Sequence, residues 1–258
     1  MKKISALVLA LLLMALCFTG CGKTEKDSEY VKNKGTLVVG ITNFEPMDYK
    51  DENGNWIGFD ADLATAFAES LGVKVKFVEI DWDNKILELD GKSIDCVWNG
   101  MTLVDEVTSS MNCTKPYCNN AQIIVVKKDV ADKYKTAESC KNLKFAVEKG
   151  SAGKDMADEN KFQYTEVDTQ STALTEVKSG QSDAAIIDSL MAGAMIGEGK
   201  GYSDLTYTAS LNSEKYGVGF RLKSDLTEML NSFFDEYKQS GKLNQIAEKY
   251  GVQEALIK

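Results

Sequence analysis

The 258-residue chain contains no histidine and only one arginine, Arg221, among its 30 basic residues. Without histidine it lacks the usual general base at neutral pH and the commonest metal ligand. With one arginine it has a single side chain that can grip a carboxylate through a planar, two-pronged fork. These absences argue against histidine-dependent catalysis and against a histidine-ligated metal, and we expect no cofactor.

Basic residues are also outnumbered by acidic ones. The chain has 39 acidic residues and a formal net charge of −9. An acidic surface repels phosphate backbones, so nucleic acid is not an expected partner.

Cysteines are few and are not spaced as in redox or zinc motifs. The four that follow Cys21 form no C-x-x-C pair, and Cys96 lies in an apolar run. We expect four free thiols, although export would permit a Cys113–Cys118 disulfide.

Long apolar runs are absent except for Ala6–Leu16 near the start. Spanning the ~30 Å hydrocarbon core takes about 20 apolar residues, so this run is too short for a membrane anchor. After two lysines, it predicts a cleaved signal peptide over residues 1–20. Gly20–Cys21 resembles a bacterial lipobox, in which the cysteine is diacylated. We therefore expect a lipid anchor at the extracytoplasmic face of the cell membrane. The alternative is ordinary cleavage that leaves Cys21 as a thiol.

Residues 22–34 are polar and charged, with almost nothing to bury. This composition is typical of a flexible segment. We expect a lipidated cysteine and flexible tether over residues 21–34.

The rest of the chain alternates short apolar strands with amphipathic helices. Asp60 is the expected N-cap of a helix that buries Leu63 and Phe67, and Ser151 is the expected N-cap of another. Alternation of this kind argues for an α/β architecture with mostly parallel sheets. Two successive β-α-β-α-β groups indicate two lobes.

The segment Gly58–Leu63, followed by Ala66 and Phe67, resembles the signature of family 3 bacterial solute-binding proteins. These are the receptors of ABC importers for polar amino acids, and the resemblance covers nearly all of residues 35–251. It implies a two-lobed periplasmic-binding-protein (type II) fold, with a mixed, mostly parallel sheet in each lobe. A two-strand hinge joins the lobes, and the ligand cleft lies between them. We expect residues 35–118 and 215–258 in lobe 1, and residues 119–214 in lobe 2.

The resemblance implies two aromatic walls for the ligand. Phe44 occupies the place of the aromatic that covers the ligand, and Trp82 would form the opposite wall. Two aromatic rings can hold an aliphatic or cationic group between them. The alternative for both residues is a place in the core of the lobe.

A strand end, Trp98–Thr102, carries the next implied contacts. By resemblance, the Gly100 carbonyl and the Thr102 hydroxyl bind the ligand's α-ammonium and carboxylate, next to Met101. Asn99 adds an amide contact. The alternative is a strand-to-helix turn in which Thr102 is an N-cap.

The family usually has an arginine five residues after this threonine, where it grips the α-carboxylate. Here that position is Val107, and Arg221 lies far away in sequence. Hydrogen bonds to charged groups contribute ~1.5–3 kcal/mol each, so the loss is substantial. Either another group binds the carboxylate or the ligand presents none.

One substitute is the loop that opens the helix after Gly150. The Ser151 hydroxyl and the backbone N–H of Ala152 would form an anion site at the helix N-terminus. Lys85 or Lys149 could add a point charge, and we interpret Lys149 as a solvated surface residue.

Asp188 ends the apolar strand Ala184–Ile187, where the resemblance places an aspartate that binds the ligand's ammonium. Glu148 lies beside it in the implied site. The alternative for Asp188 is an N-cap. Two acids, two aromatics and no arginine favour positively charged ligands.

The leading hypothesis is a monomeric, lipid-anchored receptor that binds a polar amino acid by hinge closure and delivers it to an ABC permease. A cationic amine or a carboxyl-modified amino acid is the alternative ligand. The alternative of a different class is a dehydratase-like enzyme on the same fold, with Glu148 or Asp188 as the acid. No nucleophile–base pair supports that enzyme, so we expect a protein that is not an enzyme.

Overall fold

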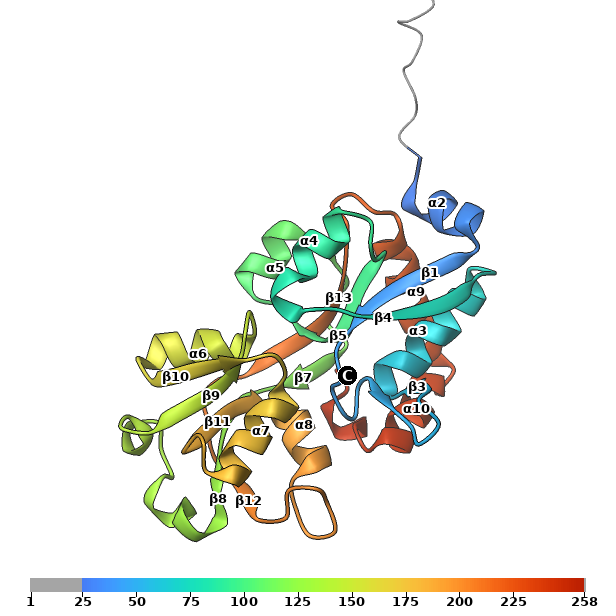
Figure 1. The fold of residues 1–258 in the computed structure, drawn as a ribbon. Coiled ribbons are helices and arrows are strands. Elements are labelled where there is room, and N and C mark those ends of the chain that lie inside the picture. The colour runs from blue at the N-terminus through green and yellow to red at the C-terminus, as the bar shows by residue number, and fades with distance from the viewer. Residues whose placement is uncertain (1–24, 258) are drawn as a thin grey trace, which may run out of the picture.

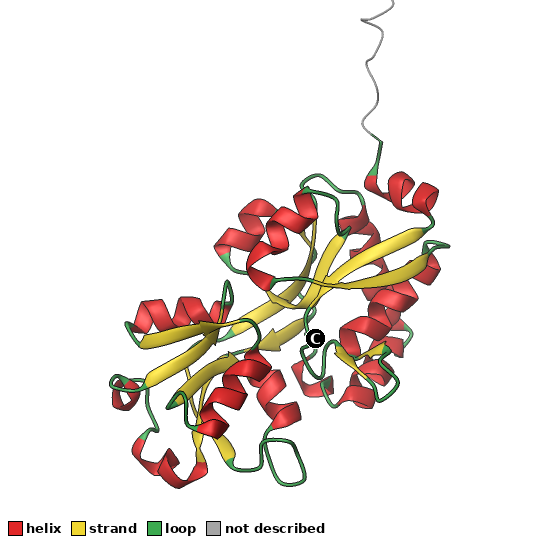
Figure 2. Cartoon of the chain, in the orientation of Figure 1, coloured by secondary structure: helices red, strands yellow, loops and turns green. Residues whose placement is uncertain are grey.

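The computed structural model describes residues 25–257, which fold into two α/β lobes that meet along a narrow junction (Figure 1). The expected signal peptide and Cys21 lie outside the described residues. Figure 2 shows helices on either side of the sheet in each lobe. Among the described residues, no helix is long and apolar enough to cross a membrane.

Lobe 1 contains a six-stranded sheet in the order β4-β1-β5-β13-β6, with β7 also paired to β13. Its strands are β1 (Thr36–Ile41), β4 (Lys74–Glu79), β5 (Cys96–Thr102), β6 (Asn112–Cys113), β7 (Cys118–Asn120) and β13 (Glu214–Phe220). A small hairpin is formed by β2 (Tyr49–Lys50) and β3 (Trp56–Ile57). The helical segments of this lobe are α2 (Asp27–Lys34), α3 (Phe59–Ser70), η1 (Trp82–Asn84), α4 (Lys85–Asp90), α5 (Asp105–Ser110), α9 (Leu226–Gln239), α10 (Lys242–Tyr250) and η4 (Gln253–Ala255).

Lobe 2 contains a five-stranded sheet in the order β10-β9-β11-β8-β12. Its strands are β8 (Gln122–Lys127), β9 (Lys144–Glu148), β10 (Gln163–Val167), β11 (Ala184–Asp188) and β12 (Leu205–Ser210). Its helical segments are η2 (Lys128–Lys133), η3 (Glu138–Cys140), α6 (Ala152–Asn160), α7 (Gln170–Ser179) and α8 (Ser189–Met195).

The central strands of lobe 2 are apolar on both faces because helices cover both faces. Ile124 and Ile186 belong to the cluster that contains Ala157 of α6. Their neighbours Val125 and Ile187 belong to the cluster that contains Leu174 of α7. Successive side chains of a strand alternate between faces, so a doubly covered strand has a continuous apolar run.

The chain passes between the lobes twice, from β7 into β8 and from β12 into β13. Both sheets are mixed. In each, two strand pairs are parallel, while the strands that run through the junction pair antiparallel to their neighbours. Antiparallel pairs are therefore at least as frequent as parallel ones, because β8 and β13 enter their sheets from the opposite lobe.

Residues 27–34 form helix α2 at the end of lobe 1 that is far from lobe 2 (Figure 1). The expectation of a flexible tether over all of 21–34 is therefore wrong for this part. Val31 is fully buried, and Nε of Arg221 lies 3.2 Å from a carboxylate oxygen of Asp27. The polar composition missed this helix because its partners lie in distant parts of the sequence.

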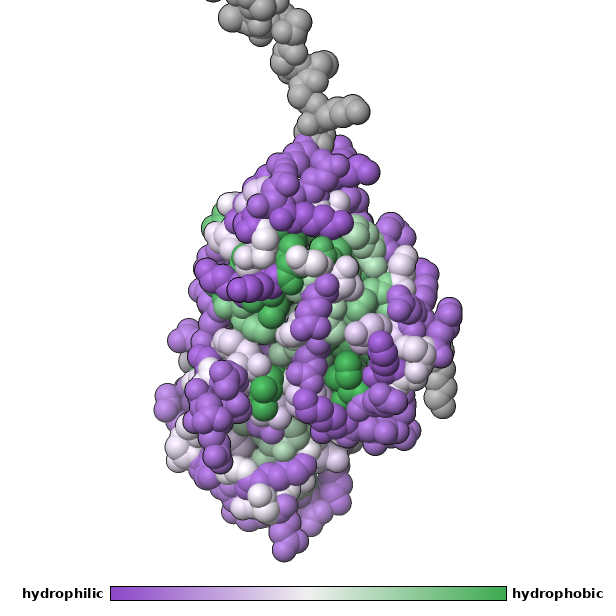
Figure 3. Space-filling model, turned by 90° about the vertical axis from the view of Figure 1, so that its right-hand side faces the viewer, coloured by the Kyte–Doolittle hydropathy of each residue, from purple (hydrophilic) through white to green (hydrophobic). Residues whose placement is uncertain are grey.

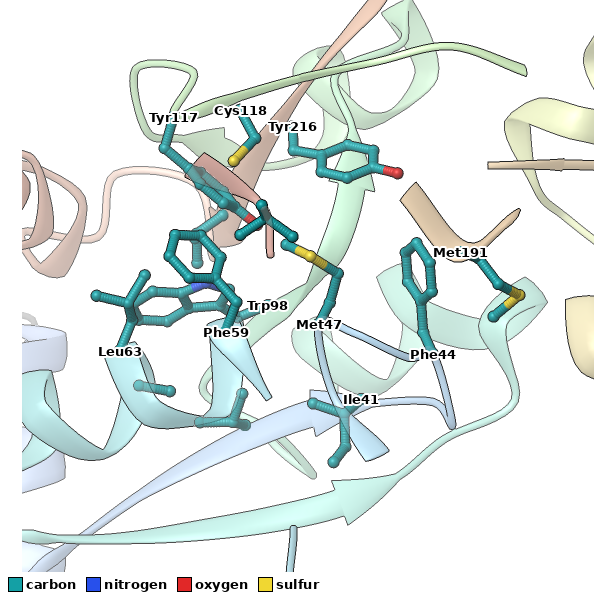
Figure 4. Close-up of a cluster of buried hydrophobic side chains, with 14 of the residues drawn as sticks. Ile41, Phe44, Met47, Phe59, Leu63, Trp98, Tyr117, Cys118, Met191 and Tyr216 are labelled. Carbon is teal, nitrogen blue, oxygen red and sulfur yellow. The ribbon is translucent and has the colours of Figure 1, made fainter. Parts of the chain in front are cut away.

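The core of lobe 1 is built on the strand β5 and extends towards the junction. Trp98 is fully buried and packs edge-on against Phe67 and Phe234. Figure 4 shows the cluster continuing to Phe44. Its ring lies between Met47, which belongs to lobe 1, and Met191, which belongs to lobe 2. Apolar contacts therefore reach across the two lobes.

Asp60 does not cap helix α3, contrary to expectation. Gly58 occupies the N-cap position, and Asp60 is fully buried within the first turn. Its carboxylate accepts hydrogen bonds from the Gly100 N–H at 2.7 Å and from the Tyr117 hydroxyl at 2.7 Å. Burial raises the pKa of Asp60 to about 7. The residue therefore fixes the end of β5.

Hydrophilic residues cover most of the face in Figure 3, and apolar ones appear there in scattered groups. The large apolar side chains that are well exposed are Leu87, Tyr207 and Leu222, which lie on separate elements. All four described cysteines are free thiols.

Candidate functional site

A cavity lies between the two lobes and is lined by residues of both. Every ligand-contacting residue expected from the sequence lines it. These residues are Phe44, Trp82, Asn99, Gly100, Met101, Thr102, Glu148, Ser151, Ala152 and Asp188. The structure adds polar and charged lining residues that were not assigned to the site, namely Thr42, Asn43, Lys85, Glu106, Asp155 and Gln170.

Gly100 allows the end of β5 to approach the Phe44 ring closely. Its φ of 55° lies in the left-handed region that favours glycine. A Cβ at this position would lie 2.5 Å from Cε1 of Phe44 and 3.1 Å from Cε2 of Tyr216. The absent side chain thus sets the position of the aromatic wall, and Phe44 is both a core residue and a cavity residue.

Asn99 is held by the end of the neighbouring strand. Its Oδ1 accepts from the Thr42 N–H at 2.9 Å, and its Nδ2 donates to the Thr42 hydroxyl at 2.8 Å. One N–H of the Asn99 amide remains for a ligand. The residue therefore also orders the loop that carries Phe44.

Thr102 connects the cavity wall to the junction. Its hydroxyl donates to Oε1 of Glu214 at 2.9 Å, and the N-cap position of α5 is occupied by Val104. The alternative that Thr102 is an N-cap is therefore wrong.

Trp82 and Lys85 lie next to each other on the opposite wall. The Trp82 side chain is buried, and Nζ of Lys85 lies 5.1 Å from the centroid of its ring. The ammonium donates to the Trp82 carbonyl at 3.3 Å and, across the cleft, to the Gly150 carbonyl at 2.9 Å. Burial lowers the pKa of Lys85, and the negative charge of Glu106 partly opposes this shift.

Lys149 is a partly exposed residue that does not line the cavity. Its Nζ lies 3.0 Å from Oδ2 of Asp83 and 3.9 Å from Oδ2 of Asp81. These ion pairs also join lobe 2 to lobe 1, so the structure has its lobes in contact across the cleft.

Val107 lines the cavity and belongs to an apolar cluster. Arg221 does not take over the expected guanidinium site. Its guanidinium donates to the Ile94 carbonyl at 2.8 Å and pairs with Asp27 and Asp95. The only arginine is thus a structural residue of lobe 1, outside the cavity.

Asp188 is buried and accepts several hydrogen bonds. Its carboxylate accepts from Gln122 Nε2 at 3.0 Å, from the Tyr216 hydroxyl at 2.7 Å, and from the side-chain amides of Asn120 and Gln170. It occupies the N-cap position of α8, but its side chain makes no capping bond. The capping alternative is therefore wrong. Burial, and then the charge of Glu214, raise the pKa of Asp188 to about 7.

Glu148 is the second buried acid of the cavity. Its Oε2 lies 3.5 Å from Nε2 of Gln170, the same amide that donates to Asp188. Burial, and then the charge of Asp188, raise the pKa of Glu148 to about 8. A cation that enters the cavity would favour the ionised form of both acids.

Ser151 is the N-cap of helix α6, as expected, because its hydroxyl accepts from the Lys154 N–H at 3.2 Å. Ala152 is the first helical residue, so its N–H has no acceptor within the helix. The helix N-terminus therefore presents a hydroxyl and backbone donors to the cavity.

The model of the family described as bacterial extracellular solute-binding proteins, family 3, matches residues 37–253. The chain belongs to this family. Its fold is the two-lobed type II periplasmic-binding-protein fold.

Relatives of this solute-binding protein include one named the arginine-binding extracellular protein ArtP of Bacillus subtilis. The two are 31% identical over 256 residues, which cover 93% of this chain and 96% of the relative. A solved structure from Streptococcus pneumoniae, an ABC uptake transporter substrate-binding protein with bound histidine, matches with a TM-score of 0.84 at 27% identity. The match covers 92% of this chain and 100% of that one. A third match is the ancestral amino acid-binding protein AncCDT-1, described as a precursor of cyclohexadienyl dehydratase. Its TM-score is 0.80 at 32% identity, over 86% of this chain and 98% of that one.

The cavity of this solute-binding protein is dominated by negative charge. Its lining includes four carboxylate residues and a single basic one. Asp188 and Glu148 are buried, whereas Glu106 and Asp155 are exposed. The arrangement can stabilise a cation and, through Lys85 and helix α6, a smaller anionic group.

Two kinds of residue were missed from the sequence of this solute-binding protein. The sequence alone does not place Lys85 in the cleft, although its position three residues after Trp82 in a helical segment is a usable signal. Gln170 and Glu214 carried no local signal, because β11, α7 and β13 bring them to Asp188 from distant segments.

Proposed function

We propose that this protein is an extracytoplasmic receptor of an ABC importer that captures an amino acid with a cationic side chain. The observation that carries the proposal is the pair of buried acids, Asp188 and Glu148, in a cavity between two lobes. Burying two ionised carboxylates costs free energy unless a proton or a counter-charge neutralises them. A cationic ligand supplies that charge.

The aromatic walls support the same class of ligand. Phe44 and Trp82 line the cavity from different segments of lobe 1. An aromatic face attracts a cation with about 0.5–2 kcal/mol, and more strongly when water is excluded. A ligand held between the rings would lie on lobe 1, within reach of the acids of lobe 2 that line the same cavity.

The relatives support this proposal through their printed names. One is called arginine-binding, and one solved structure has histidine bound. Both ligands are amino acids with basic side chains.

We further propose that Cys21 is lipidated after removal of residues 1–20, and that the protein acts as a monomer tethered beside its permease. Capture by hinge closure would bring the lobes into one shape that the permease recognises. The two junction segments between the sheets, at residues 120–122 and 210–214, are the candidate hinge.

The enzymatic alternative rests on Glu148, whose raised pKa would keep it protonated as an acid in the cavity. The ancestral match is itself described as an amino acid-binding protein, although also as a precursor of a dehydratase. We favour the receptor because the described residues that line the cavity offer no nucleophile paired with a general base.

Calorimetric titration of the protein with L-arginine, L-lysine, L-histidine and L-glutamate tests the proposal. We expect binding of at least one of the three basic amino acids and none of L-glutamate. Asp188→Asn should weaken that binding by at least tenfold, because it removes a buried counter-charge. The matched control is Glu159→Gln, an exposed acid of α6. Binding of L-glutamate alone, or recovery of a chemically altered ligand, would contradict the receptor for basic amino acids.

A further inference from the structure

Among the described residues Lys85 is a buried ammonium that forms no ion pair, and the nearest negative charges, with Glu106 first, act on it only from a greater distance. Its side chain lines the cavity, and the residue is 5% exposed. Among the ion pairs of the described residues, none involves Lys85. A buried charge without a partner is costly, so its retention requires a compensating interaction.

The hydrogen bonds of Lys85 leave room for one more acceptor. An ammonium has three N–H donors. Two of them bind the carbonyls of Trp82 and Gly150, at 3.3 Å and 2.9 Å. The third is available to an acceptor in the cavity that this side chain lines.

The position of Gly150 connects Lys85 to a second set of donors. Gly150 immediately precedes Ser151, the N-cap of α6, and Ala152, whose backbone N–H lacks an acceptor within the helix. An ammonium bound to the Gly150 carbonyl therefore lies beside a helix N-terminus, which favours negative charge. Together they can bind the two oxygens of one carboxylate.

Among residues 25–257, the other basic residues that could bind a carboxylate do not line the cavity. Val107 stands where the resemblance implies an arginine, and Arg221 is bound within lobe 1. Lys149 is partly exposed and is paired with Asp83 and Asp81. Within the described part of the chain, Lys85 is the one basic residue that lines this cavity.

We infer that Lys85, with the N-terminus of helix α6, binds the α-carboxylate of the ligand in place of the missing arginine. This assignment rests on the proposed function of the cavity. It separates the ligand's charges, with the carboxylate at Lys85 and the cationic groups at Asp188 and Glu148. The ligand class is then a basic amino acid. The amine that lacks the carboxylate should bind more weakly, because it leaves Lys85 without its acceptor.

The test compares each basic amino acid with its decarboxylated amine: L-arginine with agmatine, L-lysine with cadaverine, and L-histidine with histamine. Binding is measured by calorimetry on the chain that begins at Cys21. We expect the wild-type protein to prefer the amino acid of at least one pair. Lys85→Met should weaken the affinity for that amino acid by about tenfold to a hundredfold. It should change the affinity for the corresponding amine by less than about threefold. The retained amine binding also shows that the variant is folded.

Two further variants sharpen the outcome. Lys149→Met removes the other cross-lobe lysine, which does not line the cavity, and should leave the preference unchanged. Adding Val107→Arg to Lys85→Met should restore part of the preference for the amino acid.

Two results would overturn the assignment separately from the proposed function. Equal losses for the amino acid and the amine in Lys85→Met would mean that Lys85 only holds the lobes together. Unchanged affinity for both would mean that it contributes nothing. Failure of the wild-type protein to bind any of the six compounds would overturn the proposed function and this assignment together.

Discussion

The carboxylates of Asp188 and Glu214 accept hydrogen bonds from the same two side-chain amides. Nε2 of Gln122 lies 3.0 Å from Oδ1 of Asp188 and 2.8 Å from Oε1 of Glu214. Nδ2 of Asn120 also donates to both acids. Because Glu214 begins β13 and also accepts from Thr102, this network connects the ligand-facing acid of lobe 2 to the junction and to lobe 1.

We predict that affinity for L-arginine or L-lysine, whose side chains stay charged throughout, rises with pH between 6 and 8. The pKa of Asp188 is raised to about 7 and that of Glu148 to about 8, so in the ligand-free protein much of each acid is protonated at pH 6. A cation binds the ionised forms, so binding releases protons and tightens as pH rises. One such group with a pKa near 7 predicts about a tenfold gain between pH 6 and pH 8. Calorimetry in phosphate and in Tris would measure both the affinity and the released protons.

Glu214→Gln provides a control for this interpretation. The charge of Glu214 contributes to the raised pKa of Asp188, so its removal should shift the rise in affinity to lower pH. Glu159→Gln, on the exposed face of α6, should leave the profile where it is. A flat profile, or affinity that falls as pH rises, would show that the buried acids do not bind the cation.

Gly100→Ala should destabilise the protein and weaken ligand binding. The substitution adds a left-handed alanine, which costs about 1–2 kcal/mol, and a Cβ that would lie 2.5 Å from the Phe44 ring. Overpacking typically costs a further 1–3 kcal/mol or so. The matched control is Gly54→Ala, where φ is +82° but nothing lies within 4 Å of the new Cβ. In urea denaturation, Gly54→Ala should lower the free energy of unfolding only by the cost of a left-handed alanine, with no cost for overpacking. Equal losses at both positions would remove the argument for a close approach at Phe44.

Arg221→Met should lower the free energy of unfolding by about 3–5 kcal/mol, because it leaves the buried Asp95 without one of its cationic partners. Trypsin should then cut more readily at Lys32 or Lys34 of α2. The exposed pair of Lys50 and Glu79 offers a control, since Lys50→Met should cost at most about 1 kcal/mol.

Ligand affinity separates a structural from a ligand-binding role for this arginine. The folded Arg221→Met protein should bind basic amino acids as the wild-type protein does, because Arg221 does not line the cavity. A selective loss of affinity for the amino acid over its amine would contradict this assignment.

Local sequence patterns predicted the α/β lobes, and the resemblance to the family supplied most of the cavity lining. Strands such as Ala184–Asp188 are apolar on both faces, so their run and its charged end are visible in the sequence. Because strand ends of an α/β sheet meet at one edge, the residues that follow them could be assigned to a common cleft. The resemblance to the family supplied Phe44 and Trp82, and together with its position at a strand end it supplied Asp188; all three line one cavity.

Helix α2 and Asp60 are two features that local sequence patterns predicted wrongly. A polar segment and a cap-like aspartate have the same sequence signature whether they face water or a distant partner. Asp27 pairs with Arg221, and Asp60 accepts from Tyr117, and in both cases the partner comes from a distant segment of the chain. Such partners exist only once the sheets have formed.

The sequence, through its resemblance to the family, thus predicted the two-lobed α/β architecture and an acidic, aromatic cleft without an arginine. The tertiary structure decided how charge is distributed within that cleft. It enclosed the ammonium of Lys85 against Gly150 of the other lobe and joined Asp188 to Glu214 through shared amides. Periodicity and strand ends are local properties of the chain, whereas the environment of a buried charge depends on every segment packed around it.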